Sequence, residues 1–100
     1  MSEYFDSIQR TLNRYPADKI EICRDSVTEE FRSENIKDEF GYLIPTVVRR
    51  ENGIIVGLFW YKDSLFHRSE KDENGENLPA VIFSDGRKAW YINGLTIRRV

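Results

Sequence analysis

Residues 37–48 read KDEFGYLIPTVV, and residues 71–82 read KDENGENLPAVI, the same pattern 34 positions further along. Lys, Asp, Glu, Gly, Pro and the first Val are identical in the two copies, and two further positions exchange one aliphatic residue for another. A chain that repeats itself at this kind of spacing is built from a repeated supersecondary unit. The repeat therefore limits the architecture more strongly than the composition does.

The repeat continues beyond these two segments. The dipeptide Trp-Tyr at 60–61 returns at 90–91, a spacing of 30, and the arginine that follows each pair, Arg68 or Arg98, lies at the same distance from its tryptophan. The spacing differs between segments because the connecting turns and loops differ in length, which exposed loops tolerate. We expect at least two copies of one unit between residue 37 and the C-terminal strand.

A weaker third copy precedes these two. Residues 22–27 end in the same basic-Asp-Ser-aliphatic order as residues 60–65, and residues 31–34 align with 67–70. If this alignment is correct, the hairpin repeats occupy residues 19–100.

Each unit is predicted to be a β-hairpin. Asp85-Gly86 and Asn93-Gly94 are dipeptides that supply positive φ for tight hairpin turns, and Asn52-Gly53 does the same in the earlier copy. The runs between the turns are rich in Val, Ile, Phe, Trp and Tyr, which suit a pleated, half-buried surface. The strands are expected near residues 19–24, 27–32, 43–50, 54–62, 65–69, 79–84, 87–92 and 95–99. Adjacent side chains on a strand face opposite ways, so one ring of each Trp-Tyr pair is expected in the core.

Residues 1–15 are predicted to form a helix. Its apolar face consists of residues at three- and four-residue spacing: Phe5, Ile8, Leu12 and Tyr15. Ser2 is suited to cap the helix, and Pro16 is suited to end it, because the residue before a proline is disfavoured in helical geometry. A helix this short is marginal alone, so we expect it to lie on the sheet. The predicted fold class is mainly β (α+β), with an N-terminal helix packed on an antiparallel β-meander of repeated hairpins.

One segment has two interpretations. Ser26 and Glu29 have the spacing of a capping box, which would begin a second helix over residues 27–40. That helix would remove the third copy of the repeat. The sequence leaves open whether residues 26–40 contain a strand or a second helix.

The composition describes one globular domain over residues 1–100, because 40% of the residues are hydrophobic and 32% are charged. No apolar run is long enough to span a bilayer, and the first residues lack a secretory apolar region. A single cysteine, Cys23, excludes an internal disulfide and suits a reducing compartment, so a cytoplasmic location is expected. The net charge of −2 gives no general attraction to nucleic acid or anionic membranes.

Residues 85–94 read DGRKAWYING. This stretch resembles the short hairpin repeats of small proteins from tailed bacteriophages and giant DNA viruses, in which Asp-Gly, Trp-Tyr and Asn-Gly recur and a His-Arg ending is common. The resemblance covers about residues 37–100. Residues 63–68 keep the His-Arg ending, whereas residues 93–98 keep the Asn-Gly turn. The resemblance implies a hairpin array of viral origin without catalytic residues. The repeats are also distantly similar to MORN repeats, but the Tyr-x-Gly spacing is absent and no lipid-binding role is carried over.

No residue pattern predicts a catalytic site, a metal site or a cofactor. His67 is the only histidine, and its place in the repeat indicates a cross-strand contact. Cys23 has no second cysteine for a zinc site, and we expect a small, at least half-buried side chain. Residues 72–77 have the oxygen-rich, glycine-centred look of a calcium loop but lack the bidentate glutamate at the required spacing, so a solvated turn is expected.

Thirteen aromatic residues are more than a core of this size is expected to bury, so some rings should lie on an outer face of the sheet. Aromatic residues and arginine anchor protein–protein contacts. The hypothesis is a small, non-enzymatic, phage-encoded protein that binds a host protein and inhibits or modulates it by steric blocking, in host takeover or anti-defence. The candidate partner-binding residues are Trp60, Tyr61, His67, Arg68, Trp90, Tyr91 and Arg98.

Three alternatives remain. One is an enzyme fragment or small hydrolase that uses His67 with a nearby carboxylate. Paired basic residues such as Arg49-Arg50 lie among aromatics, as in proteins that bind single-stranded nucleic acid, although pairing with Asp and Glu across strands is the more ordinary role. A virion or self-assembling structural protein is the third alternative, since open hairpin arrays have exposed edges and could form homo-oligomers.

Overall fold

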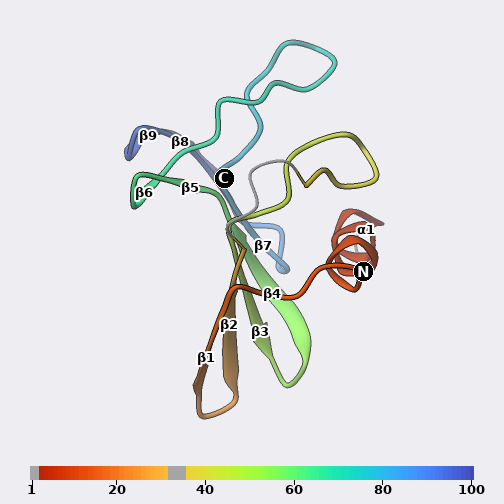
Figure 1. The fold of residues 1–100 in the computed structure, drawn as a ribbon. Coiled ribbons are helices and arrows are strands. Elements are labelled where there is room, and N and C mark those ends of the chain that lie inside the picture. Colours follow the sequence, from red (N-terminus) through yellow and green to blue (C-terminus); the bar gives the residue numbers. More distant parts are fainter. Residues whose placement is uncertain (1–2, 32–35) are drawn as a thin grey trace.

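The computed structural model describes residues 3–31 and 36–100, which contain one helix and nine strands. Helix α1 spans Glu3–Leu12. The strands are β1 (Lys19–Cys23), β2 (Ser26–Glu30), β3 (Val47–Glu51), β4 (Ile54–Phe59), β5 (Tyr61–Lys62), β6 (Leu65–Phe66), β7 (Val81–Phe83), β8 (Lys88–Ile92) and β9 (Leu95–Arg99). Seven of them form an antiparallel sheet in the order β1-β2-β3-β4-β7-β8-β9, while β5 and β6 form a separate hairpin (Figure 1). The predicted fold, a helix with an antiparallel meander, is confirmed.

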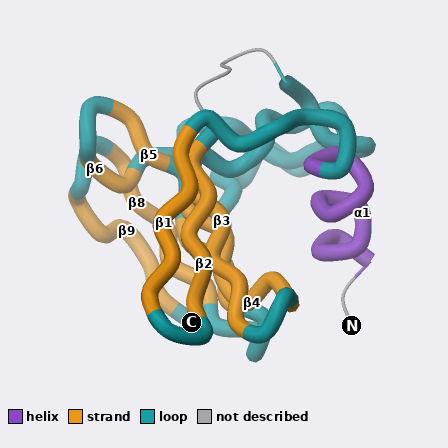
Figure 2. Tube along the Cα trace, turned by 60° about the horizontal axis from the view of Figure 1, so that its bottom comes forward, coloured by secondary structure: helices purple, strands orange, loops and turns teal. Residues whose placement is uncertain are grey.

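Helix α1 covers one face of the sheet, which we call the inner face (Figure 2). Its side chains Phe5, Ile8 and Leu12 are buried in one cluster with Val48 and Leu58 of the neighbouring strands β3 and β4. Removal of this apolar area from water is the main stabilising contribution to a helix of ten residues. The β5–β6 hairpin lies on the opposite side, which we call the outer face.

The helix ends earlier than predicted. Tyr15 lies beyond Leu12 and is 41% exposed, so it is not part of the buried helical face. The amide of Tyr15 donates to the carbonyl of Leu12, three residues earlier, at 3.1 Å. This bond is of the 3₁₀ type and ends the α-helical pattern. The predicted cap, Ser2, lies outside the described residues.

Strand β2 settles the choice between a strand and a second helix at residues 26–30. It pairs with β1 and β3 on its two sides, so the capping-box pattern of Ser26 and Glu29 is overridden by the sheet. Four other predicted strands are shortened or divided: the predicted strands 65–69 and 79–84 form only at Leu65–Phe66 and Val81–Phe83. The predicted strand 43–50 begins only at Val47, and the predicted strand 54–62 is divided at Trp60 into β4 and β5. Residues 32–35 of the predicted helix and strand lie outside the described part.

Three hairpins, β1–β2, β3–β4 and β7–β8, share one pattern of connection. The amide of Trp60, which follows β4, donates to the carbonyl of Ala80 at 2.8 Å, just before β7. In the same way, the amide of Phe31, which follows β2, donates to the carbonyl of Thr46 at 2.8 Å, just before β3. The third copy is therefore present, but in a different alignment from the one predicted: Phe31 occupies the position of Trp60, not that of His67.

The two identical Lys-Asp-Glu segments form two equivalent loops. Oδ1 of Asp38 accepts hydrogen bonds from the backbone amides two and four residues later, at 2.9 and 3.1 Å. Oδ1 of Asp72 accepts the corresponding pair at 2.8 and 3.0 Å. Gly41 and Gly75 take the same position in the two loops, with φ of 86° and 79°. The loop that resembled a calcium site thus directs its first carboxylate at its own backbone.

Candidate interaction surface

Trp60 and Arg68 form a buried stack between the first full copy and the second. The guanidinium of Arg68 lies 3.8 Å from the centre of the Trp60 ring, and both residues are only 4% exposed. Arg68 also donates from Nη1 to the carbonyl of Pro79 at 3.1 Å and from Nε to Glu70 at 3.2 Å. The prediction that these two residues contact a partner is corrected, because their side chains are buried within the protein, in contact with both copies.

Trp90 and Arg98 repeat this stack at the surface. The guanidinium of Arg98 lies 4.6 Å from the Trp90 ring, and Nε1 of Trp90 donates to the carbonyl of Asn77 at 2.8 Å. Nε1 of Trp60 makes the equivalent bond, to Leu43, at 3.1 Å. The local geometry is shared, but Trp90 is only half-buried and Arg98 is exposed.

His67 joins the two copies. Its backbone amide donates to the carbonyl of Trp60 at 3.0 Å, across the β5–β6 hairpin. Its ring nitrogen Nδ1 accepts a hydrogen bond from the backbone amide of Asn93 at 2.9 Å, in the turn between β8 and β9. His67 was predicted to be a strand residue with a cross-strand contact; it lies just after β6, and its side chain instead bonds the turn between β8 and β9.

Tyr61 and Tyr91 lie in an aromatic cluster with three phenylalanines of the outer face. The Phe66 ring is central: its centre lies 4.7 Å from Tyr61, 5.0 Å from Tyr91 and 6.1 Å from Phe59. Phe59 in turn meets Phe83 edge to face at 5.7 Å. We call these five residues the outer aromatic face. Ring pairs at such separations contribute about 0.5–1.5 kcal/mol each beyond area burial.

Gly57 makes room for this cluster. A Cβ at Gly57 would lie 2.9 Å from the Phe59 ring, so the ring occupies the space that any other residue would need. The Phe59 ring meets the Phe83 ring edge to face. The guanidinium carbon of Arg87 lies 4.7 Å from the centre of the Phe83 ring. A glycine within a strand commonly marks such a close approach.

The outer aromatic face is partly open to solvent. Tyr61 is 36% exposed and its neighbour Leu65 is 50% exposed, while the remaining rings are half-buried. Burial, with a smaller contribution from the carboxylate of Glu30, raises the pKa of the Tyr61 phenol, which therefore stays a neutral donor and acceptor at physiological pH. The face thus combines apolar area, a phenolic hydroxyl and an arginine at its rim.

The sequence analysis named the tyrosines of this surface but missed its phenylalanines. The signal was present in the two-residue alternation of Gly57 with Phe59 and of Val81 with Phe83, which places each pair on one face. The exposure of each ring could not be read from that alternation, because it depends on where the β5–β6 hairpin folds over the sheet.

Three of the basic residues considered for nucleic acid form ion pairs with carboxylates. The contacts are Arg49 with Glu51 at 3.1 Å, Arg50 with Glu29 at 2.5 Å and Arg87 with Asp85 at 2.7 Å. Arg50 is also bonded to Gln9 of α1, so it joins the helix to the sheet. These three cations present less free positive charge to a phosphate backbone than their number implies.

A hollow of about 540 Å³ lies on the inner face, beside the first turn of α1. Its walls are mainly aromatic and aliphatic, with Tyr4, Phe40, Tyr42 and Ile82 among the lining residues. Arg68 also reaches it, although the hydrogen bonds described above are made within the protein. The volume is of the size that small ligands occupy.

Within residues 3–31 and 36–100, no group of three or more His, Cys, Asp or Glu side chains is placed to hold a metal ion. Cys23 is exposed at the end of β1, so the prediction of an at least half-buried thiol was wrong. No helix of the described part is both long and apolar enough to cross a membrane. Comparison of the chain with protein-family models, curated proteins and solved structures gave no match.

Proposed function

We propose that this protein is a small, non-enzymatic binding protein that acts by occupying the surface of another protein. The observation that carries the proposal is the outer aromatic face, a connected set of five rings with Tyr61 and Leu65 exposed at its edge. Aromatic side chains and arginine supply most of the binding free energy in protein–protein interfaces. Inhibition by steric blocking requires such a surface and no catalytic group.

The class of partner follows from the resemblance of residues 85–94 to viral hairpin repeats. If the chain is encoded by a bacteriophage, its partner is a host protein in the bacterial cytoplasm, and host takeover or anti-defence is the expected role. The ring–ring contacts within the surface support this role, since side chains already held by their neighbours lose less conformational freedom when a partner binds.

The test is affinity purification from nuclease-treated bacterial lysate with three forms of the tagged protein. The first is the wild type, and the second is the double variant Tyr61→Ser with Leu65→Ser, which removes the exposed edge of the outer aromatic face. The third is Tyr15→Ser, a control that removes a tyrosine of similar exposure from the segment after α1. Circular dichroism establishes that all three forms are folded.

We expect one stoichiometric host protein with the wild type and with Tyr15→Ser, and at least a tenfold loss with the double variant. Retention of the same host protein by the folded double variant would reject the outer aromatic face as the binding surface. The absence of any stoichiometric protein from all three forms would reject a host protein as the partner.

Nucleic-acid binding is the weaker alternative, because Arg49, Arg50 and Arg87, three of the basic residues that suggested it, are paired with carboxylates. The self-assembly alternative rests only on the two edge strands of the sheet, β1 and β9, whose residues are exposed.

A further inference from the structure

The β5–β6 hairpin lies outside the seven-stranded sheet but supplies the exposed edge of the outer aromatic face. Each of its strands has two residues. A hairpin this short is not stable by itself in water, so its position depends on contacts with the rest of the protein. The shape of the outer aromatic face, in which Phe66 is the central ring, therefore depends on what holds this hairpin in place.

The hairpin is held against the turn between β8 and β9. The amide of Gly94 donates to the carbonyl of Phe66 at 2.8 Å, and the amide of Asn93 donates to Nδ1 of His67 at 2.9 Å. The contact is close, because a Cβ at Gly94 would lie 3.2 Å from the side chain of Leu65. A further bond, from the amide of the residue after His67 to a carbonyl of β8, joins backbone groups as the first one does. Only the bond at His67 uses a side chain that titrates.

The bond at His67 exists only while the imidazole is neutral. A backbone N–H can only donate, so Nδ1 must present its lone pair and the single ring proton must lie on Nε2. When Nδ1 takes up a proton from solvent, both ring nitrogens are donors, and an N–H group then opposes the amide of Asn93. Histidine is the side chain whose charge ordinarily changes between about pH 5 and pH 8. Acidification therefore removes an acceptor from the contact between hairpin and turn.

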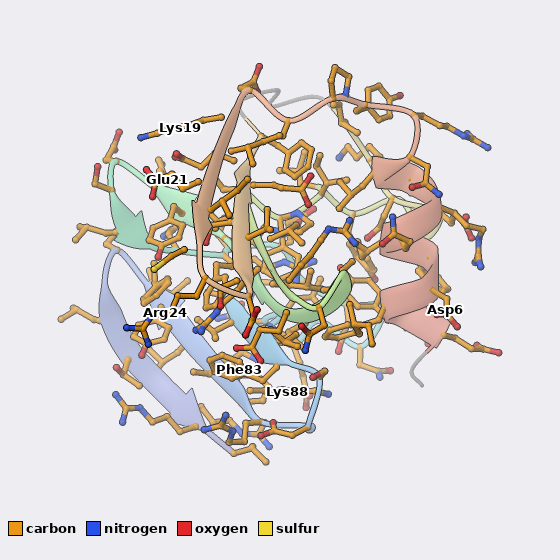
Figure 3. All side chains as sticks on the ribbon, turned by 90° about the horizontal axis from the view of Figure 1, so that it is seen from below. Asp6, Lys19, Glu21, Arg24, Phe83 and Lys88 are labelled. Carbon is orange, nitrogen blue, oxygen red and sulfur yellow. The ribbon has the colours of Figure 1, made fainter. Side chains whose placement is uncertain are left out.

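The charges around the ring offer an imidazolium little compensation. The β8–β9 hairpin, which faces the ring, contains three cations and no carboxylate: Lys88, Arg98 and Arg99. Figure 3 shows Lys88 at the start of β8, the end remote from the turn that His67 contacts. The β5–β6 hairpin and the residues just after it carry two cations and two carboxylates: Lys62, Arg68, Asp63 and Glu70. Glu70 is paired with Arg68, which leaves Asp63 as the counter-charge on this side. The other titratable side chains of the two hairpins are the phenols of Tyr61 and Tyr91.

The second copy has an isoleucine in place of this histidine. Ile97 precedes Arg98 as His67 precedes Arg68. In the first copy the position contacts the turn of the second copy, whereas Ile97 is 52% exposed. The imidazole thus occurs in the copy in which its acceptor nitrogen is used.

We propose that His67 makes a pH-dependent contact within the protein: the neutral imidazole holds the β5–β6 hairpin against the β8–β9 turn, and the imidazolium releases it. This contact is a property of the free protein and goes beyond the proposed function. Its consequence for binding rests on the proposed function, because the released hairpin carries Tyr61 and Leu65, the exposed edge of the outer aromatic face. Acidification should then weaken the binding of a partner.

The test is amide hydrogen exchange of the free protein, measured by NMR at about pH 8 and about pH 5, the range in which histidine changes charge. The protection factor of the Gly94 amide reports whether the hairpin is in place, because its acceptor belongs to β6. Asn52 is the internal control: it has nearly the same φ as Asn93, 52° against 49°, but its amide donates to the carbonyl of Asp25. The matched variant is His67→Asn, in which Oδ1 can replace Nδ1 as the acceptor and does not titrate.

In the wild type we expect the protection of Gly94 to fall by about tenfold on acidification, the effect of one lost hydrogen bond, while Asn52 stays protected. His67→Asn should keep the protection of Gly94 at both pH values. Every other titrating group is retained in this variant, so none of them can account for the difference. Unchanged protection of Gly94 at a pH where the ring signals of His67 show protonation would overturn the proposal, and so would an equal loss in His67→Asn.

His67→Ala provides a second test if asparagine does not supply the acceptor at pH 8. Without any acceptor at this position, Gly94 should be weakly protected at both pH values. Protection equal to that of the neutral wild type would overturn the proposal. Both measurements use the free protein, so they can fail while the outer aromatic face passes its own binding test, and the reverse.

Discussion

The first full copy of the repeat, residues 37–68, and the second, residues 71–98, have the same local structure in different surroundings. Each has an aspartate-centred loop, a tryptophan bonded to that loop and an arginine on the tryptophan ring. In the first copy the tryptophan is 4% exposed, whereas in the second it is only half-buried. The sequence of a copy therefore determines its internal contacts, while the copy that follows determines how deeply they are buried.

This difference is typical of repeat proteins, in which stability comes from each unit and from the interface with its neighbour. Pro79 of the second copy accepts a hydrogen bond from Arg68 of the first. Among the described residues, Arg98 stacks on Trp90 but makes no hydrogen bond equivalent to that of Arg68 with Pro79. The predictions below compare the two copies, beginning with the largest expected effect.

The two tryptophans should differ most. Trp60→Ala should lower the free energy of unfolding by about 3–5 kcal/mol, because it leaves a large cavity beneath the buried Arg68. Trp90→Ala should cost about 1–2 kcal/mol, because part of this ring is already in water. Urea unfolding of both variants gives the two values, and equal losses would show that the second copy does not cover the first.

A substitution at Gly57 tests whether the outer aromatic face depends on the close approach of the Phe59 ring to the backbone of Gly57. Gly57→Ala should cost about 1–3 kcal/mol, since the added Cβ meets the Phe59 ring. Thermal unfolding measures the loss. The control is the same substitution in a Phe59→Leu background, where the clash is relieved. An equal loss in both backgrounds would mean that the ring is not the reason for this glycine.

The two loop aspartates offer a second matched comparison. Asp38→Ala should cost about 2–3 kcal/mol, because this carboxylate is buried and accepts the Tyr4 hydroxyl at 3.2 Å in addition to its two backbone amides. Burial raises the pKa of Tyr4, so its hydroxyl remains a donor. Asp72→Ala, in a more exposed loop, should cost about 1 kcal/mol.

Asp72→Asn serves as the control for these aspartates, because the amide keeps an oxygen for both backbone bonds and should leave the urea midpoint nearly unchanged. The comparison would be contradicted if Asp72→Ala cost as much as Asp38→Ala.

The smallest effect is expected at the last turn of each copy. Asp63 and Ser64 have φ of 52° and 66°, the positive values that Asn93 and Gly94 adopt in the second copy. Ser64→Gly should therefore stabilise the protein, by about 1 kcal/mol, because glycine takes this conformation without a Cβ penalty. The reverse change, Gly94→Ser, should destabilise it. Calorimetric melting temperatures that move in the same direction for both would exclude this explanation.

The sequence predicted the hairpins well, because turn chemistry and alternation are local. Asn52-Gly53 and Asn93-Gly94 both form turns with positive φ, and β1, β8 and β9 lie within one residue of their predicted bounds. The capping-box pattern at Ser26 is also local, but it was overridden by strand pairing on both sides of β2. A local preference for starting a helix is weaker than the backbone hydrogen bonds that β2 makes with a strand on each side.

The candidate surface was less predictable, because exposure depends on contacts between copies. Trp60 and Arg68 were predicted to contact a partner and are buried, while Phe66 and Phe83 were not considered and lie on the outer aromatic face. The third copy was recognised, but its alignment was wrong, because Phe31 replaces the tryptophan by which the other copies are matched. Only the hydrogen-bond pattern identifies that replacement.

Hydrogen exchange of the two tryptophan indole N–H groups tests most directly whether the second copy buries the tryptophan of the first. The chain has two tryptophans, so an NMR spectrum should show one indole N–H signal for each. Both N–H groups make the same kind of bond, to a loop carbonyl at 3.1 Å for Trp60 and 2.8 Å for Trp90. The account predicts that Trp60 exchanges only through global unfolding, whereas Trp90 exchanges much faster through local opening. Equal rates, or slower exchange at Trp90 with its shorter bond, would contradict it.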